Sequence, residues 1–175
     1  TGDVNANLNL LSYRKKFTKV SNYIKEGDCY QVNLSQKYKV STSGDSWIFY
    51  KKFRVMNKSP YMAYLSYDDF EIMSGSPEQF IQSRNKNITT RPIKGTRARD
   101  NDPVKDKANL KELSLSLKDQ AENLMIVDLL RNDLAINCEL GSIKVDELFT
   151  VESYPNVHHL VSSITATLKN NSNNY

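Results

Sequence analysis

The first part of the chain carries apolar residues at helical spacing. Within residues 12–26, Phe17, Val20 and Ile24 recur every three to four positions, which is typical of an amphipathic helix with one buried face. Gly27 follows directly and is a common stop signal for a helix. We therefore expect a helix over residues 12–26.

The period then changes to two. Between residues 30 and 40, apolar side chains alternate with polar ones: Tyr30, Val32, Leu34, Tyr38 and Val40 stand between Gln31, Asn33, Ser35, Lys37 and Lys39. Such alternation is typical of a strand with one buried face. We expect a half-buried strand over residues 30–40.

The middle of the chain predicts several short elements. We expect a helix over Trp47–Met56, capped by Asp45 or Ser46. Paired strands Tyr61–Tyr67 and Phe70–Ser74 should follow, joined by a turn at Asp68–Asp69. A short helix from Pro77 to Ile81 and a strand over Asn87–Ile93 complete this part. Turn residues separate these segments, as they do in compact domains.

The second half of the chain predicts long helices and a final strand. Pro103–Ala135 is helical throughout, and we expect two helices that meet near Lys118, the second buried because its run LMIVDLL is apolar nearly all round. The final strand, His158–Leu168, has an apolar face of Leu160, Ile164, Ala166 and Leu168 and a polar face of His159, Ser163, Thr165 and Thr167. Strands outnumber helices without regular alternation, which predicts an α+β fold with a mainly antiparallel sheet and packed helices.

We expect one domain over residues 1–175, with loose Asn-rich tails at 1–8 and 169–175. The chain carries 24 Lys+Arg and 20 Asp+Glu, a net charge of +4, with the two signs interleaved. This favours a mixed-charge surface over a nucleic-acid interface.

No apolar run approaches the roughly 20 residues that span a bilayer, and no leader pattern is present. Cys29 and Cys138 are expected to be reduced thiols of a cytosolic protein.

Two residues near predicted strand ends could carry chemistry. Lys94 stands between Ile93 and Gly95, where partial burial would favour an uncharged, nucleophilic amine. A surface turn lysine is the alternative interpretation. Glu78 follows a strand and small residues, and could act as a general acid there. It could equally occupy the first turn of a helix.

Two further positions lie next to apolar segments. Glu122 precedes LMIV by one turn, so its carboxylate needs a cation, a metal or a capping donor. Stabilisation by the helix dipole is the alternative. Of the pair His158–His159, we expect His158 to be a core residue and His159, on the polar face, to be the functional candidate. No second pair of ligands at metal spacing accompanies them, which argues against zinc.

Five ordered blocks between Gly27 and Leu168 resemble one known family. They are GDCYQVNLSQ, SGSPEQF, TRPIKGTRAR, KDQAENLMIVDLLRNDL and VESYPNVHHLVSSITATL. The chain resembles the chorismate-utilising enzymes, the family of anthranilate synthase, aminodeoxychorismate synthase and the isochorismate synthases. The resemblance covers most of the chain and implies the chorismate-binding fold.

The resemblance implies a role for each matching residue. Glu78 matches the general acid that protonates the leaving C4 hydroxyl of chorismate, and Glu122 matches a Mg²⁺ carboxylate. His159 matches a residue that lines the ring pocket. Thr96, after the turn glycine Gly95, matches a position that contacts the substrate.

Two positions indicate the branch of the family. Aminodeoxychorismate synthases carry PIKGT, as here, with the lysine attacking C2 of chorismate, whereas anthranilate synthases usually carry Ala where this chain has Lys94. Isochorismate-forming members usually have a lysine where this chain has Gln31. Gln31 with Lys94 is the aminodeoxychorismate combination, which implies Mg²⁺ as cofactor and ammonia from a glutamine amidotransferase subunit.

The chain also departs from the family pattern. Ala135–Ile136 stand where the family commonly has Gly-Arg after RNDL, and the chain ends before the family's Gly-rich block, its carboxylate-binding arginine and its second metal carboxylate. We therefore expect an inactive fragment of the synthase. The alternatives are anthranilate synthase with an atypical lysine, or a non-catalytic module that docks on a partner or self-associates through uncovered surface.

Overall fold

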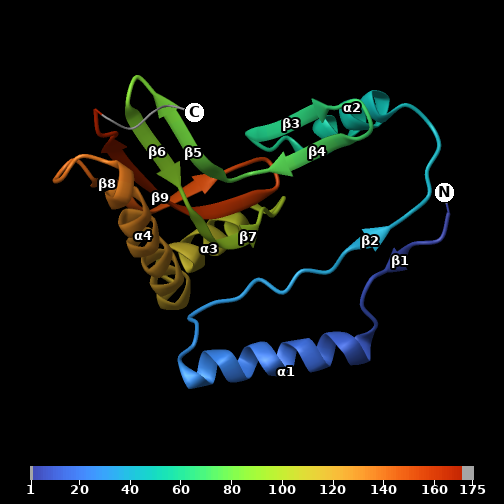
Figure 1. The fold of residues 1–175 in the computed structure, drawn as a ribbon, viewed down its shortest axis with the longest axis horizontal. Coiled ribbons are helices and arrows are strands. Elements are labelled where there is room, and N and C mark those ends of the chain that lie inside the picture. The colour runs from blue at the N-terminus through green and yellow to red at the C-terminus, as the bar shows by residue number, and fades with distance from the viewer. Residues whose placement is uncertain (1, 171–175) are drawn as a thin grey trace. The chain divides into compact units, whose positions relative to one another are not determined.

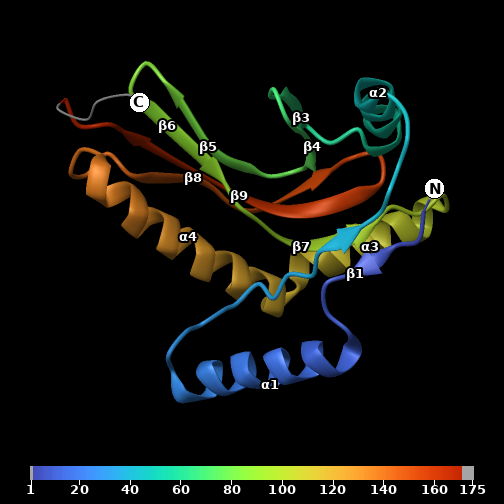
Figure 2. The same ribbon diagram turned by 45° about the vertical axis from the view of Figure 1, so that its right-hand side comes forward.

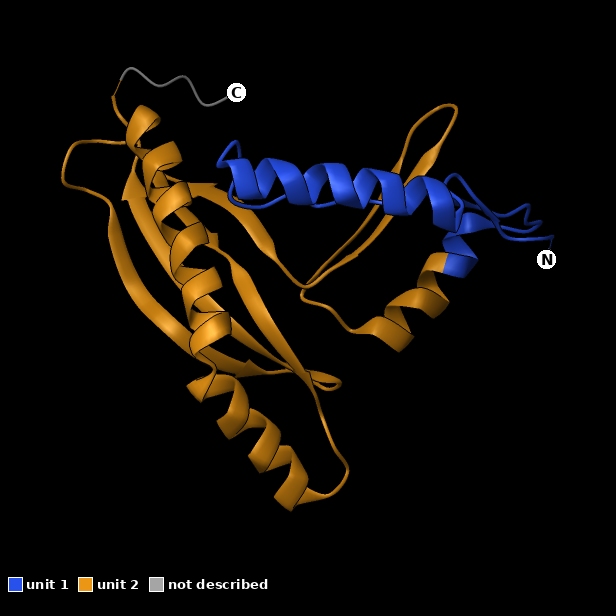
Figure 3. Ribbon diagram, turned by 90° about the horizontal axis from the view of Figure 1, so that it is seen from below, with its two compact units in different colours: residues 1–49 blue, residues 50–175 orange. Residues whose placement is uncertain are grey.

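The computed structural model describes residues 2–170. It divides into two compact units, residues 1–49 and 50–175 (Figure 3), and each is described by itself. Of the tails that we expect to be loose, residue 1 and residues 171–175 lie outside the described part. Within it, Asn5 and Ala6 form a short strand, β1 (Asn5–Ala6).

The first unit contains one long helix, α1 (Leu10–Glu26), coloured blue in Figure 1. Asn9 caps it, because its side-chain oxygen accepts a hydrogen bond from the Ser12 N–H at 2.9 Å. Gly27 ends it with φ at 83°, a left-handed conformation that glycine adopts without a Cβ penalty. The predicted helix and its stop are confirmed.

The strand predicted over residues 30–40 is wrong for most of its length. Only β2 (Tyr38–Lys39) is a strand, paired antiparallel with β1. Residues 31–37 have no regular secondary structure, and Tyr30 is 88% exposed. A strand exists only through its hydrogen-bonded partner, and the partner present in the described part of this unit is two residues long.

A helix and a hairpin open the second unit. The helix α2 (Ser46–Asn57) begins just before the boundary, and Asp45 caps it by accepting from the Ile48 N–H at 2.8 Å. The strands β3 (Tyr61–Ser66) and β4 (Glu71–Ser76) pair antiparallel, drawn in green beside α2 in Figure 1. Both the predicted helix and the predicted strand pair are confirmed.

The main sheet is built around one long strand, β9 (Val157–Thr167). Its neighbours are β6 (Asn87–Arg91), β7 (Ile93–Ala98) and β8 (Lys144–Ser153), with β5 (Gln79–Arg84) outside β6. All pairs are antiparallel. β6 and β7 follow one another along one edge of β9, and β8 pairs with its opposite edge. The predicted final strand is confirmed, as is the α+β class.

Two predictions in this sheet need correction. The short helix expected from Pro77 to Ile81 is instead the beginning of β5, which forms a hairpin with β6 across Asn85 and Lys86. Both turn residues have positive φ, 51° and 65°, as two-residue hairpin turns require. The strand expected over residues 87–93 is divided at Pro92, which has no N–H to donate to a ladder.

Two helices cover one face of the sheet, below it in Figure 2. They are α3 (Pro103–Leu115) and α4 (Leu117–Asn137), which meet at Ser116, close to the predicted break. Ser116 ends the first helix and caps the second, its hydroxyl accepting from the Asp119 N–H at 3.3 Å. Helix α4 is not buried all round as predicted, because Leu124 and Leu129 are exposed on the side away from the sheet.

The core lies between α4 and the sheet. It consists of Ile88, Val127, Leu134, Cys138, Ile164 and Ala166. Both cysteines are free thiols, Cys138 buried and Cys29 half-buried. Within residues 2–170, none of the helices combines the length and the apolar character needed to cross a membrane.

Candidate functional site

Glu78 lies in the connection from β4 to β5. Its backbone N–H donates to the Ser76 hydroxyl at 3.1 Å, which shapes the turn. Its Oε1 accepts a hydrogen bond from the backbone N–H of Ile93 at 2.8 Å. The carboxylate is therefore held at the first residue of β7, although the residue itself is exposed.

Lys94 and Gly95 form a β-bulge in β7. Ile93 pairs with Val161 and Thr96 with His159, so two residues of β7 stand opposite one residue of β9. Lys94 is half-buried and directly follows the residue that binds the Glu78 carboxylate. The backbone of Lys94 therefore directly follows the residue that anchors the candidate acid.

Glycine is required at position 95 for two reasons. Its φ is 84°, in the left-handed region. A Cβ there would also lie 2.8 Å from Asp119 Cβ and 2.9 Å from Leu113 Cδ1. The bulge therefore packs directly against the ends of α3 and α4, which fixes the backbone around Lys94.

His159 and Thr96 are joined across β9 and β7. The Thr96 hydroxyl and His159 Nδ1 share a hydrogen bond of 2.9 Å. His159 is only 6% exposed, and burial lowers its pKa below the usual value, although the nearby carboxylates of Glu152 and Glu78 act to raise it. Burial therefore favours the uncharged form of the imidazole, which is oriented through one nitrogen.

Glu78 lines a cavity of about 260 Å³ between the sheet and α4. The other lining residues are Ser76, Gln79, Phe80, Thr90, Pro92, Ile126 and Leu130. Glu122 precedes Ile126 and Leu130 by four and eight residues, so it lies on the same face of α4. A second cavity, of about 230 Å³, is lined by His159 and Tyr154 among others.

The donors around Glu122 do not form a metal site by themselves. Its carboxylate oxygen lies 3.8 Å from Lys118 Nζ, an exposed pair one helical turn apart. Across residues 2–170, no group of three His, Cys, Asp or Glu side chains is arranged to hold a metal ion. Mg²⁺ usually takes one or two carboxylates and completes its shell with water and substrate oxygens, so Glu122 would hold the ion only together with other donors.

The structure brings together most of the residues that the sequence selects. Glu78, Lys94, Gly95, Thr96 and His159 lie along the beginning of β5, the bulge of β7 and the first half of β9. Glu122 precedes Ile126 by one turn of α4 but does not line the Glu78 cavity itself. Gln31 belongs to the first unit, where it is exposed in the segment after α1.

Sequence reasoning missed a polar network next to His159. An Arg91 nitrogen, Nη2, forms an ion pair with Glu152 Oε1, and the Tyr154 hydroxyl donates to Glu152 Oε2 at 2.7 Å. Burial and the Glu152 hydrogen bond raise the pKa of Tyr154 to about 12. The signal that could have found this network is the block VESYPNV, but its strand, β8, was not predicted.

A second network ties the bulge strand to the helices. Arg97 pairs with Glu112 of α3 and, at 2.9 Å, with Asp119 of α4. Arg99 holds Asp106 of α3 through two hydrogen bonds of 2.8 and 2.9 Å, which keeps the pKa of that carboxyl well below its usual range. These pairs brace β7 and keep the bulge in place.

His158 is the core residue that the sequence predicts. It is 1% exposed, and its two ring nitrogens contact Ser153 Oγ at 2.7 Å and Asp106 Oδ1 at 3.0 Å. A buried imidazole with both nitrogens engaged is a satisfied structural group.

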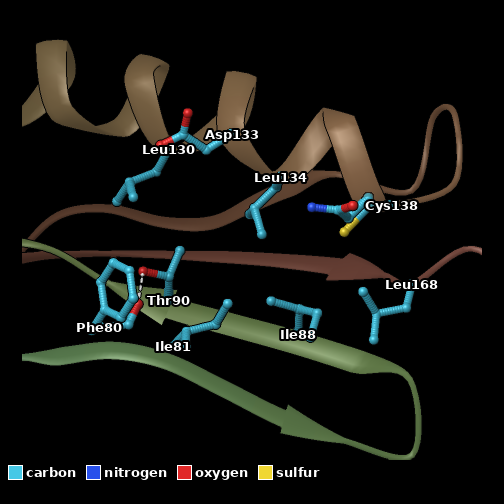
Figure 4. Close-up of a pocket in the computed structure, with 10 residues that line it drawn as sticks. Phe80, Ile81, Ile88, Thr90, Leu130, Asp133, Leu134, Cys138 and Leu168 are labelled. Atoms are coloured by element: carbon cyan, nitrogen blue, oxygen red, sulfur yellow. Dashed lines mark hydrogen bonds between the residues drawn. The ribbon is translucent and has the colours of Figure 1, made fainter. Parts of the chain in front are cut away.

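A larger cavity, of about 410 Å³, lies further along α4 (Figure 4). Its lining is mostly apolar, with Phe80, Ile88 and Leu134 among the residues drawn, and the Thr90 hydroxyl donates to the Phe80 carbonyl at 2.5 Å. It shares Phe80, Thr90 and Leu130 with the Glu78 cavity but contains none of the residues that the sequence selects. Of these two cavities, only the Glu78 cavity is lined by a candidate residue.

Comparison with known proteins gives a consistent result along the chain. The family model described as chorismate binding enzyme matches residues 1–174. Aminodeoxychorismate synthase component 1 of Salmonella typhimurium is 50% identical over 163 residues, which is 93% of this chain and 36% of that protein. Anthranilate synthase component 1 of Saccharolobus solfataricus is 43% identical over 162 residues, 93% of this chain and 38% of that protein.

A solved structure agrees with these relatives. The crystal structure of anthranilate synthase component I from Streptococcus pneumoniae superposes with a TM-score of 0.86 at 29% identity, covering 97% of this chain and 37% of that one. The chain thus spans little more than a third of the length of the proteins it matches.

Proposed function

The chain belongs to the chorismate-binding enzyme family, and we propose that it is part of an aminodeoxychorismate synthase component 1. The observation that supports this branch is Lys94, held in the bulge of β7 directly after the residue whose N–H binds the Glu78 carboxylate. A displacement on a hydroxylated ring needs a nucleophile and a proton donor, and we propose Lys94 and Glu78 for these two roles.

The proposed reaction begins with the uncharged amine of Lys94. Its Nζ attacks C2 of chorismate, the ring double bonds shift, and the C4–O bond breaks. Glu78 gives its proton to that oxygen, which leaves as water, while the lysine nitrogen loses a proton. The product of this step is a covalent adduct between Lys94 and the ring.

Ammonia completes the proposed reaction. It attacks C4, the double bonds return, and the bond between C2 and Lys94 Nζ breaks as the lysine regains a proton. The result is 4-amino-4-deoxychorismate, the precursor of p-aminobenzoate and folate. The relative's name, component 1, supports a second subunit, and we propose a glutamine amidotransferase that supplies the ammonia.

Other residues of the site would position the ring. His159, held by Thr96, offers an oriented imidazole, and Gly95 fixes the bulge by packing against Asp119 and Leu113. Glu122 would be one ligand of a Mg²⁺ ion that neutralises a substrate carboxylate, with further donors from outside the described residues. No step above depends on that ion.

Anthranilate synthase is the second candidate. The relative from Saccharolobus solfataricus and the structure from Streptococcus pneumoniae both carry that name. In that reaction the amino group enters the ring without a lysine adduct, so the two functions differ at Lys94.

The product decides between them. In the longer protein that contains this chain, supplied with chorismate, Mg²⁺ and ammonium, we expect aminodeoxychorismate by mass spectrometry. The variant Lys94→Ala should lose that product, whereas Lys144→Ala, an exposed lysine at the start of β8, should retain it. Anthranilate from the unmodified protein, or an unchanged product from Lys94→Ala, would contradict the proposal.

The 175-residue chain alone should not turn over chorismate, because no three donor side chains within residues 2–170 are arranged to hold a metal ion. Measurable turnover would refute this expectation. If the chain is instead an assembly module, sedimentation should show concentration-dependent association with no chorismate binding.

A further inference from the structure

Three strands bring opposite charges together next to His159. Glu152 of β8 is the cross-strand partner of His159 on β9. Arg91, from β6 on the other edge of β9, forms an ion pair with Glu152, and the two side chains are only 27% and 23% exposed. The guanidinium therefore reaches across β9 to a carboxylate that flanks the imidazole.

The second oxygen of the same carboxylate orders an aromatic ring. The Tyr154 hydroxyl donates to Glu152 Oε2 at 2.7 Å. The Tyr154 ring lies 5.7 Å from the His159 ring, at an interplanar angle of 57°. Glu152 thus has one oxygen on Arg91 and the other on the residue that contacts the imidazole.

We propose that the Arg91–Glu152 ion pair is a positioning device for His159, in which Glu152 holds Tyr154 against the imidazole and Arg91 neutralises the carboxylate that flanks it. The inference rests on the proposed function only for the role of His159 as a site residue. The contacts themselves are independent of substrate.

The charges around His159 define what the ion pair does. The carboxylates of Glu78 and Glu152 act on His159, and the Tyr154 ring lies beside it. Arg91 pairs with Glu152 and also lies 3.9 Å from a Glu147 oxygen. Lys58, which follows α2, lines the cavity of about 230 Å³ that His159 and Tyr154 also line. Burial lowers the pKa of His159, whereas the carboxylates raise it, so a carboxylate without its guanidinium would favour the charged imidazolium.

Two variants should therefore shift the titration of His159 in opposite directions. Arg91→Met leaves the Glu152 charge uncompensated and should raise the pKa of His159. Glu152→Gln removes that charge and should lower it further. The matched control is Arg131→Met, because Arg131 pairs with the exposed Asp128 on its own helix, and it should leave the titration unchanged.

The measurement is an NMR titration of the imidazole nitrogens in the 15N-labelled 175-residue chain. A merely structural ion pair would change stability without moving the His159 titration, so unchanged titration in both variants, or shifts of the same sign, would overturn the proposal. If Arg91→Met does not fold, Glu152→Gln decides alone: a lowered pKa supports the proposal and an unchanged one overturns it.

A third variant tests the aromatic contact. Tyr154→Phe keeps the ring but removes the hydroxyl that binds Glu152, so the His159 ring resonances should move as the tyrosine ring loses its anchor. Unmoved resonances would overturn that part of the proposal. None of these readouts uses chorismate, so the proposed function can fail in the product assay while this inference stands, and the reverse.

Discussion

The two ends of β9 are built on different principles. In the second half of the strand, Ile164 and Ala166 pack against Val127 and Leu134 of α4. In the first half, His158 and His159 are equally buried but are held by side-chain hydrogen bonds to Asp106, Ser153 and Thr96.

The difference determines which side-chain substitutions each end of β9 tolerates. Apolar burial stabilises in proportion to area and has no direction, so the second half needs only side chains of suitable size. A buried polar group needs a partner at the right distance, and losing that partner costs about 1–3 kcal/mol. The first half therefore tolerates only side chains that keep these hydrogen bonds, and the candidate site lies there.

The largest expected effect is on the apolar end. Ile164→Ala removes buried methyl groups from a side chain with 0% exposure and should lower the free energy of unfolding by about 2–5 kcal/mol. Urea unfolding followed by circular dichroism measures this. Leu140→Ala, at a fully exposed residue, should cost less than about 0.5 kcal/mol. Equal losses would mean that the apolar end is not the core.

The next largest effect comes from replacing Gly95 in the bulge, where backbone strain and side-chain packing can be told apart. Gly95 and Gly141 both have positive φ, 84° and 78°, but only Gly95 has atoms where a Cβ would be. Gly95→Ala should therefore cost about 1–3 kcal/mol more than Gly141→Ala, the usual cost of overpacking. The comparison is again made by urea unfolding. Equal costs would show that the bulge does not pack against the helices.

A smaller effect concerns pH at the polar end. Arg99 keeps the pKa of Asp106 below its usual range, so the stability from this contact is present above the unfolded pKa of about 4 and is lost as the pH falls through the folded value. Asp106→Asn should therefore weaken the dependence of unfolding free energy on pH in acid. Asp128→Asn, in an exposed pair, is the control. An unchanged acid dependence in Asp106→Asn would contradict the assignment.

The smallest expected effect is that of Mg²⁺. With one candidate carboxylate, Glu122, in residues 2–170, the chain alone should show the same melting temperature with MgCl₂ as with KCl of equal ionic strength. A stabilisation by Mg²⁺ that Glu122→Gln abolishes would mean that a complete site is already present.

Sequence patterns predicted the elements whose stability is local. The helix over residues 12–26 carries its own caps, and the β3–β4 hairpin has its two strands on either side of a short turn. The strand expected over 30–40 depended on a partner that the pattern cannot reveal. Strand β8 was missed because its register shifts near Glu147 and a positive φ of 58° at Phe149 break the alternation.

The residues of the candidate site also divide into those that the sequence could select and those that only the fold reveals. Glu78, Lys94 and His159 could be selected because each is a chemically distinctive residue beside a turn or a strand end. Arg91 and Glu152 could not, because only the sheet brings residues so far apart in the sequence into an ion pair. Glu78 was expected near a helix and is instead anchored by the backbone of β7.

The role of Lys94 as nucleophile is tested most directly by peptide mass spectrometry. The longer protein that contains this chain is mixed with chorismate without ammonia, quenched in acid and digested. We expect the peptide that contains Lys94 to carry the mass of chorismate less water, and Lys94→Ala to carry none. An unmodified Lys94 peptide in a protein that still forms aminodeoxychorismate would contradict the account.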